Sequence, residues 1–184
     1  MGAKLALVHW EDIRRRQPQM AALGEERLGG PGVVLVGTVC LSGEARISPV
    51  EPLFWNGDLW LSMLWASKKA HDLLRDPRVL VHSAVASRDG SNGEYKVRGW
   101  ARLEPDPAAQ ARYASAISDH AGWRPEPGEF HLFWIEITRL AFIRYEEPSG
   151  DQFVASWPPT REYVRRASTA TSLGEPERYS HLLV

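Results

Sequence analysis

Runs of apolar residues separated by turn residues divide the first part of the chain into strands. Residues 33–41 (VVLVGTVCL) are apolar and rich in β-branched side chains, which is typical of a strand buried on both faces. Residues 46–55 predict a second strand, and residues 58–63 (DLWLSM) predict a third. Asn56 and Gly57 between them form a dipeptide that strongly favours a two-residue type I′ turn. The pattern therefore predicts an antiparallel hairpin with its register set by this turn.

The second predicted strand contains a proline at position 49. Proline has no backbone N–H to donate to a neighbouring strand, so we expect this strand to lie at an edge of the sheet or to carry a bulge. Side chains alternate between the two faces of a strand. One face of this strand therefore carries Arg46, Ser48, Val50 and Phe54.

Three segments have the composition of helices. Residues 10–27 are expected to be helical up to the break at residues 29–32 (GGPG). Ser67 is a favourable N-cap for a second helix, which should end near Arg75, before an Asp-Pro pair. Residues 106–123 begin with proline and are rich in alanine, which predicts a third helix.

The remaining strands are predicted at residues 78–85, 94–103 and 129–146, the last as one strand or as two joined by a bend. A polar turn at residues 86–93 precedes the second of these. Beyond Glu147 the periodicity fades, and the end of the chain is expected to be a loosely held tail unless a partner covers it.

The resulting order of elements is β-β-β-α-β-β-α-β, in which hairpin connections dominate. Such connections give a mostly antiparallel sheet, and the helices are too few to cover both faces of a parallel one. A small closed barrel with outlying helices fits this pattern, because closure removes exposed sheet edges.

Composition excludes several classes of protein. The 184 residues carry a net charge of −1, which argues against a general nucleic-acid binder. The chain has one cysteine, Cys40, so it forms no internal disulfide, and a cytoplasmic location is expected. Its first residues have too short an apolar run for a signal peptide, and no stretch approaches the length of a membrane helix. The six histidines are scattered, and no metal site is predicted.

Positive charge nevertheless gathers at two predicted element ends. Lys68 and Lys69 begin the second helix, where free backbone N–H groups favour an anion and where cations oppose the helix dipole. Arg46 can bind a phosphate through two hydrogen bonds, and Ser48 and Ser62 offer hydroxyl groups on neighbouring strands. These residues predict a local phosphate site. Two alternatives stay open, namely that both lysines are solvated and that Arg46 pairs with a neighbouring glutamate, Glu44 or Glu51.

Other side chains are weaker candidates. Cys40, inside an apolar strand, is expected to be a small buried side chain rather than a nucleophile. His71 and Asp72 are expected to face solvent or a partner subunit. Trp55, Trp60 and Trp65 surround the hairpin and the helix entry, and they either wall a ring pocket or pack in the core or an interface.

Three motifs together carry a family resemblance: the Arg-x-Ser-Pro-Val strand, the Asn-Gly hairpin, and Ser-Lys-Lys-Ala leading to Arg-Asp-Pro-Arg-Val. With them, the segment from Val33 to Leu103 resembles the FMN-binding split-barrel family of pyridoxamine 5'-phosphate oxidase. Agreement is weaker from Phe133 to Tyr145.

The resemblance implies a mainly β protein with a six-stranded antiparallel split β-barrel and peripheral helices. It further implies a barrel domain over residues 1–150 and a C-terminal extension over residues 151–184, which packs on the barrel or on a partner. It also implies a homodimer with FMN at the subunit interface. The implied cofactor-binding residues are Arg46, Ile47, Ser48, Pro49, Val50, Leu61, Ser62, Lys68 and Lys69. Of these, Arg46 and Lys69 would hold the phosphate, Lys68 and Ser62 would assist, and residues 47–50 would run beside the flavin ring.

The chain departs from the oxidase itself at two places. Glu94 stands where the oxidase has a glutamine near the flavin, and the C-terminal region (PPTREYVRRASTATS) lacks the Arg-x-His that closes the oxidase's substrate site. The sequence therefore predicts an FMN-dependent oxidoreductase that acts on a small molecule other than pyridoxamine phosphate. Because the cofactor supplies the chemistry, no catalytic side chain is predicted. The alternatives are a reductase of the same fold that uses the deazaflavin coenzyme F-420, and a non-enzymatic flavin carrier or redox sensor.

Overall fold

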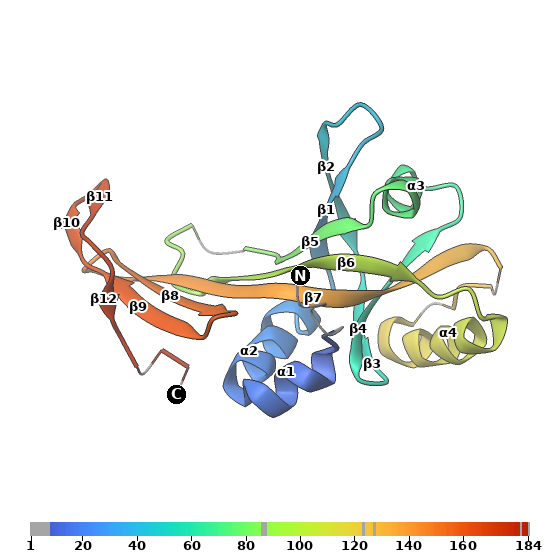
Figure 1. Ribbon diagram of the computed structural model, residues 1–184, viewed down its shortest axis with the longest axis horizontal. Coiled ribbons are helices and arrows are strands. Elements are labelled where there is room, and N and C mark those ends of the chain that lie inside the picture. The colour runs from blue at the N-terminus through green and yellow to red at the C-terminus, as the bar shows by residue number, and fades with distance from the viewer. Residues whose placement is uncertain (1–7, 86–87, 123, 127, 181, 184) are drawn as a thin grey trace, which may run out of the picture.

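The computed structural model describes residues 8–85, 88–122, 124–126, 128–180 and 182–183. Two residues of the predicted turn, 86–87, and the last residue of the third predicted helix, 123, lie outside this range. A long antiparallel sheet runs through the molecule, with four helices around one half of it and the C-terminal strands extending the other half (Figure 1).

The helices are α1 (Trp10–Arg16), α2 (Pro18–Gly29), α3 (Lys68–Arg75) and α4 (Pro107–Ala121). None of these described helices is long and apolar enough to cross a membrane. The strands before α4 are β1 (Val34–Val39), β2 (Ala45–Val50), β3 (Pro52–Trp55), β4 (Asp58–Leu64), β5 (Arg78–Ser83) and β6 (Glu94–Leu103). Those after it are β7 (Phe130–Glu146), β8 (Asp151–Trp157), β9 (Arg161–Arg165), β10 (Ala167–Thr169), β11 (Ser172–Leu173) and β12 (Glu177–Arg178).

Strand β7 is the longest strand and connects the two parts of the sheet. It is one continuous strand of 17 residues and pairs with β6 along most of its length. Its other edge is shared, because Phe130–Trp134 pair with β4 whereas Leu140–Glu146 pair with β8. The sheet therefore has two halves joined by β7: a half bearing the helices, and an arm built from β8, β9 and β12 (Figure 1).

The predicted second strand is divided at Glu51. Its first part, β2, pairs with β1, and its second part, β3, pairs with β4. The sheet path runs from β7 through β6, β5 and β1 to β2, and returns to β7 through β3 and β4. Within the described residues no ladder joins β2 to β4, so the two branches are linked by the chain at Glu51. The predicted antiparallel sheet is confirmed, whereas closure of a barrel by hydrogen bonds is not found.

Two local predictions are confirmed. Asn56 and Gly57 both have positive φ, +49° and +83°, as a type I′ turn requires, and Trp55 pairs with Asp58 across the turn. Pro49 lies in β2, which pairs on one side only and so forms an edge of the sheet.

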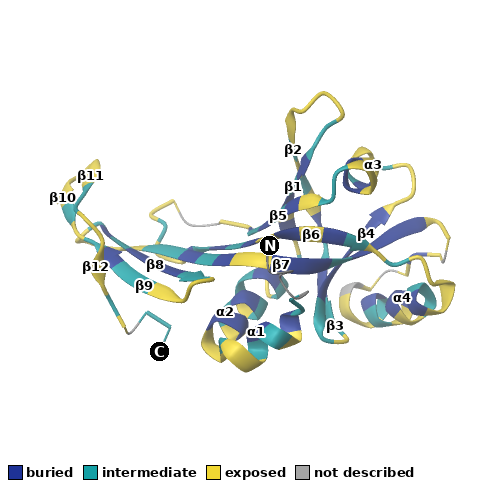
Figure 2. Ribbon diagram, in the orientation of Figure 1, coloured by how far each residue is buried: buried dark blue, intermediate teal, exposed yellow. Residues whose placement is uncertain are grey.

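Helices α1 and α2 cover the main core. The predicted helix over residues 10–27 is interrupted at Gln17, because Pro18 follows it and begins α2. Trp10 is fully buried beneath the two helices, and the Tyr95 hydroxyl of β6 donates to the Met20 carbonyl of α2 at 2.9 Å. Helix α4 covers a second, smaller cluster on β3, β4 and β7 (Figure 2).

The region after Glu147 differs from its predicted character. Instead of an unpatterned tail, β8 pairs with the second half of β7, and β9 pairs with β8. Phe153, Val154 and Ala155 are consecutive and all buried. Strand β8 therefore lacks the alternation of apolar and polar residues from which a strand is predicted. The Arg144 guanidinium lies 4.3 Å from the centre of the Phe153 ring, which holds β7 and β8 together on one face.

Candidate functional site

The start of α3 presents unused polar groups. Ser67 occupies the N-cap position, as predicted, but its hydroxyl makes no capping hydrogen bond. Its Oγ atom is buried and has no hydrogen-bond partner in the described chain. The backbone N–H groups of Lys68 and Lys69 likewise find no acceptor in the part of the chain that the structure describes. Three donors at one helix end are therefore available to an anion.

Asp72 fixes this helix end against the sheet. Its carboxylate is buried and lies on α3 one turn after the two lysines. It accepts a hydrogen bond from Thr38 Oγ1 of β1 at 2.9 Å and one from Arg46 Nε of β2 at 2.7 Å. Arg75 lies 3.6 Å from its other oxygen and donates to the Val39 carbonyl. The helix is thus tied to both strands through one carboxylate.

These contacts set the charge states of the cluster. Burial raises the pKa of Asp72, but hydrogen bonds from Arg46 and Thr38 and the charges of Arg46 and Arg75 outweigh it, so its pKa lies below 3.8. The hydrogen bond to Asp72 raises the pKa of Arg46 in turn. Asp72 is therefore ionised and Arg46 charged at neutral pH. The prediction that Asp72 faces solvent or a partner is wrong, because a buried carboxylate requires the partners that it has here.

A first hollow of about 690 Å³ opens beside Arg46. Lys68 and His71 line it from α3, and Cys40 lines it from the loop after β1. A terminal nitrogen of Arg46 lies 3.1 Å from the Cys40 sulfur. The predicted place of this cysteine inside a strand is wrong, since β1 ends at Val39 and the thiol is only half-buried.

A second hollow of about 400 Å³ lies on the other side of the α3 start. It is lined by Lys69 together with Pro49 and Val50 of β2 and Ser62 of β4. Ser62 Oγ accepts a hydrogen bond from the Tyr113 hydroxyl at 3.2 Å and keeps its own proton to donate.

The nine predicted cofactor-binding residues thus fall around one helix end without forming one cavity. Arg46 and Lys68 line the first hollow, and Lys69 lines the second. Ile47 points outward and is 72% exposed, whereas Leu61 is fully buried in the core and offers only its backbone. The remaining predicted residues are Ser48, which is half-buried in β2, and Pro49, Val50 and Ser62, which line the second hollow.

Sequence reasoning placed Asp72 outside this cluster and did not name Thr38. Arg46 pairs with Asp72, and neither Glu44 nor Glu51, its two expected alternatives, is its partner. Thr38 is the cross-strand neighbour of Arg46 in the ladder between β1 and β2. A threonine among the apolar residues of that strand was the available signal, because a buried hydroxyl needs a partner.

The carboxylate of Glu94 interacts with two neighbouring side chains. It pairs with Lys96 at 2.6 Å and with His82 Nε2 at 3.1 Å. Burial raises its pKa, but Lys96 and His82 outweigh that effect, so the pKa of Glu94 lies below its ordinary value and the carboxylate is ionised.

The three tryptophans near the hairpin separate into two groups. Trp60 is buried against Tyr113 of α4, and Trp55 packs edge-on to Trp60 with ring centres 5.5 Å apart. Trp65 differs, because it is 57% exposed at the entry to α3. Core packing is thus the role of Trp55 and Trp60, and Trp65 lines a further hollow.

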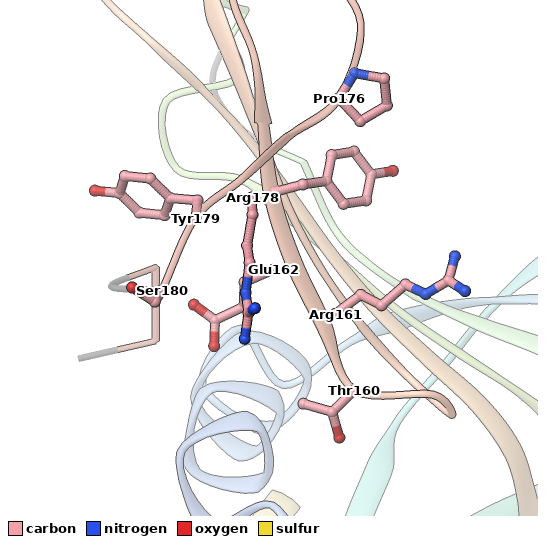
Figure 3. A pocket seen from close by; sticks show the side chains of 8 residues that line it. Thr160, Arg161, Glu162, Pro176, Arg178, Tyr179 and Ser180 are labelled. Carbon is pink, nitrogen blue, oxygen red and sulfur yellow. The ribbon is translucent and has the colours of Figure 1, made fainter.

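A hollow of about 640 Å³ lies in the arm, far from α3 along the long axis of the molecule (Figures 1 and 3). Arg161 and Tyr163 line it from β9, and Arg178 and Tyr179 line it from the last strand and the segment after it. Glu162 also lines this hollow, and its carboxylate accepts a hydrogen bond from the Leu182 backbone N–H at 3.0 Å. None of the predicted site residues lies in this hollow.

Known structures share this fold. The chain matches a putative pyridoxamine 5'-phosphate oxidase from Listeria innocua with a TM-score of 0.54 and 18% identity, over 67% of this chain and 94% of the other. An F420 reductase matches with a TM-score of 0.50 and 19% identity, over 63% and 94% of the two chains. A heme-binding protein from Mycobacterium smegmatis matches with a TM-score of 0.51 and 20% identity, over 66% and 53%. At these identities the likeness establishes the fold alone.

A comparison with curated proteins finds no match. The family model described as pyridoxamine 5'-phosphate oxidase matches residues 22–144, which include the α3 start, β2 and the second hollow. This match covers most of the chain, including the whole segment from Val33 to Leu103 that carries the three motifs of the resemblance. The chain therefore belongs to the pyridoxamine 5'-phosphate oxidase-like family.

Proposed function

We propose that this protein is an FMN-dependent oxidoreductase whose cofactor phosphate binds at the start of α3. The observation that carries the proposal is the buried Ser67 hydroxyl, which has no partner in the described chain although it stands beside two lysines with unused backbone N–H groups. A buried hydroxyl without a partner is costly, and an anion at this helix end would satisfy it.

The residues present fit a phosphate-bearing cofactor. Lys69 and Ser62 approach the second hollow, Lys68 approaches the first, and Asp72 holds Arg46 beside them. Pro49 and Val50 of β2 supply an apolar wall for a ring. When bound, the flavin supplies hydride and one-electron chemistry, and the protein contributes position and electrostatic environment.

We further propose that the protein is a homodimer with the cofactor at the interface. Ile47 of β2 is 72% exposed, and Leu35 of the adjacent β1 and Trp100 of β6 are each 38% exposed. Gly37 lies between Ile47 and Leu80 in the sheet, which leaves a shallow apolar hollow of about 500 Å³. An exposed apolar patch of this kind on the face of a sheet is typical of a protein interface.

Two alternatives share the same phosphate site. A reductase that uses coenzyme F-420 is favoured by the likeness to an F420 reductase, and that cofactor also presents a phosphate. A non-enzymatic carrier is favoured by the absence of a predicted catalytic side chain, and a heme-binding protein shares the fold. The three functions differ in cofactor or in turnover, so they are separable by experiment.

The test is a titration of the purified protein with FMN, followed by flavin absorption and by quenching of flavin fluorescence. We expect saturable binding of one FMN per chain and a yellow complex. Failure of FMN to bind, together with saturable binding of coenzyme F-420, would replace the proposed cofactor with the alternative one. Failure of both to bind would reject the proposal.

Turnover is the second test. The FMN complex is mixed with reduced nicotinamide under anaerobic conditions, and then with a panel of small electron acceptors. Bleaching of the flavin absorption followed by its return on addition of an acceptor supports an oxidoreductase. A flavin that binds tightly and is never reduced or reoxidised by any of them supports the carrier.

A further inference from the structure

A third hollow near the α3 start has a different character from the other two. Its volume is about 540 Å³, which is within the range of small-molecule sites. It lies between the entry to α3 and the first turn of α4. Its lining consists of Trp65, Leu103, Pro105, Pro107, Gln110, Gly128, Phe130 and His131.

Trp65 is held rigidly at this hollow. Its backbone N–H donates to the Glu129 carbonyl at 3.1 Å, and its carbonyl lies 3.0 Å from His71 Nε2. Its ring stacks on the ring of His131 with centres 4.3 Å apart and planes 16° apart. Although fixed in this way, the residue is 57% exposed, and Leu103 across the hollow is 43% exposed. The hollow thus presents a positioned aromatic ring and an apolar wall to solvent.

The lining carries no formal charge at neutral pH. Burial, with the nearby His71, lowers the pKa of His131, so its ring is neutral. The Gln110 side-chain N–H group donates to the Glu104 carbonyl at 3.0 Å, which leaves its oxygen as an acceptor. A charged ligand would lose its hydration here without gaining an ionic partner. The hollow therefore suits a neutral ligand with a planar ring and a single polar group.

This hollow adjoins the proposed cofactor site. Phe130 lines both this hollow and the one that contains Lys69 and Ser62. Leu64 lines the cofactor side, and the next residue, Trp65, lines this one. A ligand in the third hollow is thus separated from the second by one segment of the chain.

We propose that the third hollow binds a neutral, planar aromatic molecule by stacking on Trp65, and that this is the class of substrate the protein accepts. The assignment as a substrate site rests on the proposed flavin-dependent function, whereas the binding itself does not. A neutral bicyclic ring with one hydroxyl group fits the volume and the polar groups described above.

The test uses isothermal titration of the protein as isolated with 2-naphthol and with naphthalene-2-sulfonate, which share a ring and differ in charge. We expect 2-naphthol to bind at least about tenfold more tightly than the sulfonate. Trp65→Ala should weaken 2-naphthol binding by about tenfold, and Leu103→Ala by about threefold. Trp65→Phe keeps a planar ring and should retain most of the affinity.

Leu74→Ala on α3 is the matched control for Leu103→Ala, because Leu74 is 44% exposed and lies outside the third hollow. It should leave 2-naphthol binding unchanged. Equal affinity for the two naphthalenes, or unchanged 2-naphthol binding in both Trp65→Ala and Leu103→Ala, would overturn the proposal.

Titration of the same variants with FMN separates the two proposals. FMN binding that is retained in Trp65→Ala while 2-naphthol binding falls supports a distinct substrate hollow. Wild-type protein that binds FMN but not 2-naphthol overturns this inference alone. Protein that binds 2-naphthol through Trp65 but binds no FMN keeps the hollow as a ligand site and overturns its assignment as a flavin substrate site.

Discussion

Asp72 shows how one buried charge organises several others. Its carboxylate accepts hydrogen bonds from Thr38 of β1 and Arg46 of β2. Asp72 itself belongs to α3, the helix that carries Lys68 and Lys69. The arginine that the sequence predicts as a phosphate ligand is therefore oriented by a residue that was predicted to face solvent or a partner. Such support matters because a flexible arginine loses side-chain entropy when it binds.

Asp72→Asn should lower the free energy of unfolding at pH 7 by about 1–2 kcal/mol, since it removes a charge-assisted hydrogen bond and leaves Arg46 without an anion. The folded pKa of Asp72 lies below 3.8, so its stabilising contribution is present above that pH and is lost as the pH falls through the folded pKa. The difference between wild type and variant in urea unfolding should thus shrink below pH 3.8.

Asp119→Asn serves as the control for this change, because Asp119 is exposed on α4. It should leave the unfolding midpoint nearly unchanged. An Asp72→Asn protein as stable as wild type at pH 7 would mean that the ion pair contributes nothing to folding.

Lys69→Ala should weaken FMN binding by about 1.5–3 kcal/mol, or roughly tenfold to a hundredfold, because one charge-assisted contact to the phosphate is lost. Fluorescence titration with FMN measures this change, and riboflavin, which has no phosphate, provides the control ligand. Riboflavin affinity should be the same in both proteins. If Lys69→Ala binds FMN as tightly as wild type does, the phosphate lies elsewhere.

At the scale of elements, the position of α2 on the sheet depends on one glycine. A Cβ atom at Gly24 would lie 2.7 Å from the ring atoms of both Trp10 and Tyr95, which are fully buried. Gly29, in the same helix, has room for a Cβ atom, with its nearest neighbour in Phe54 at 3.6 Å. Alanine substitutions at these two positions therefore distinguish the effect of helix propensity on stability from the effect of packing.

Gly24→Ala should lower the free energy of unfolding by about 1–3 kcal/mol, because overpacking outweighs the gain in helix propensity. Gly29→Ala, its matched control, should leave stability unchanged or raise it by up to about 1 kcal/mol. Thermal and urea unfolding of both variants measure the effect. Equal stabilisation by the two substitutions would contradict the close packing of α2 on β6.

Local chemistry made some elements predictable. The Asn56–Gly57 turn follows from residues that tolerate positive φ, and the edge position of β2 follows from Pro49. The division at Glu51 was not predictable, because each half of that segment pairs with a different strand far along the chain. Strand β8 was not predicted, because three consecutive buried residues interrupt the alternation of apolar and polar residues that is typical of a strand with one buried face.

The candidate site shows the same limit. Arg46, Lys68 and Lys69 were predicted from their residue types at element ends and from the family motifs. Asp72 lies 26 residues from Arg46 in sequence, and nothing local indicates that the helix turns this carboxylate toward β2. The exposed Trp65 was noted, but its separation from Trp55 and Trp60 depends on where α4 packs.

At the scale of the whole molecule, the outer face of the helix-bearing half is the most informative surface. Ile47, Leu35 and Trp100 are exposed there on β2, β1 and β6, next to the residues of the proposed cofactor site. A second copy of the chain that covers this face would remove these apolar side chains from water, which is favourable. Interface and cofactor site are therefore expected to depend on each other.

Ile47→Asp tests this dependence, since it places a charge at the most exposed of these three apolar residues. Light scattering after size-exclusion chromatography should give twice the chain mass of 20.7 kDa for wild type and the single mass for the variant. Leu74→Asp adds the same charge on α3, away from this face, and should stay dimeric.

The monomeric Ile47→Asp variant should also bind FMN at least about tenfold more weakly, because half of an interfacial site is lost. A monomeric variant with wild-type affinity for FMN would show that one chain forms the whole cofactor site, whereas a dimeric variant would place the interface on another face.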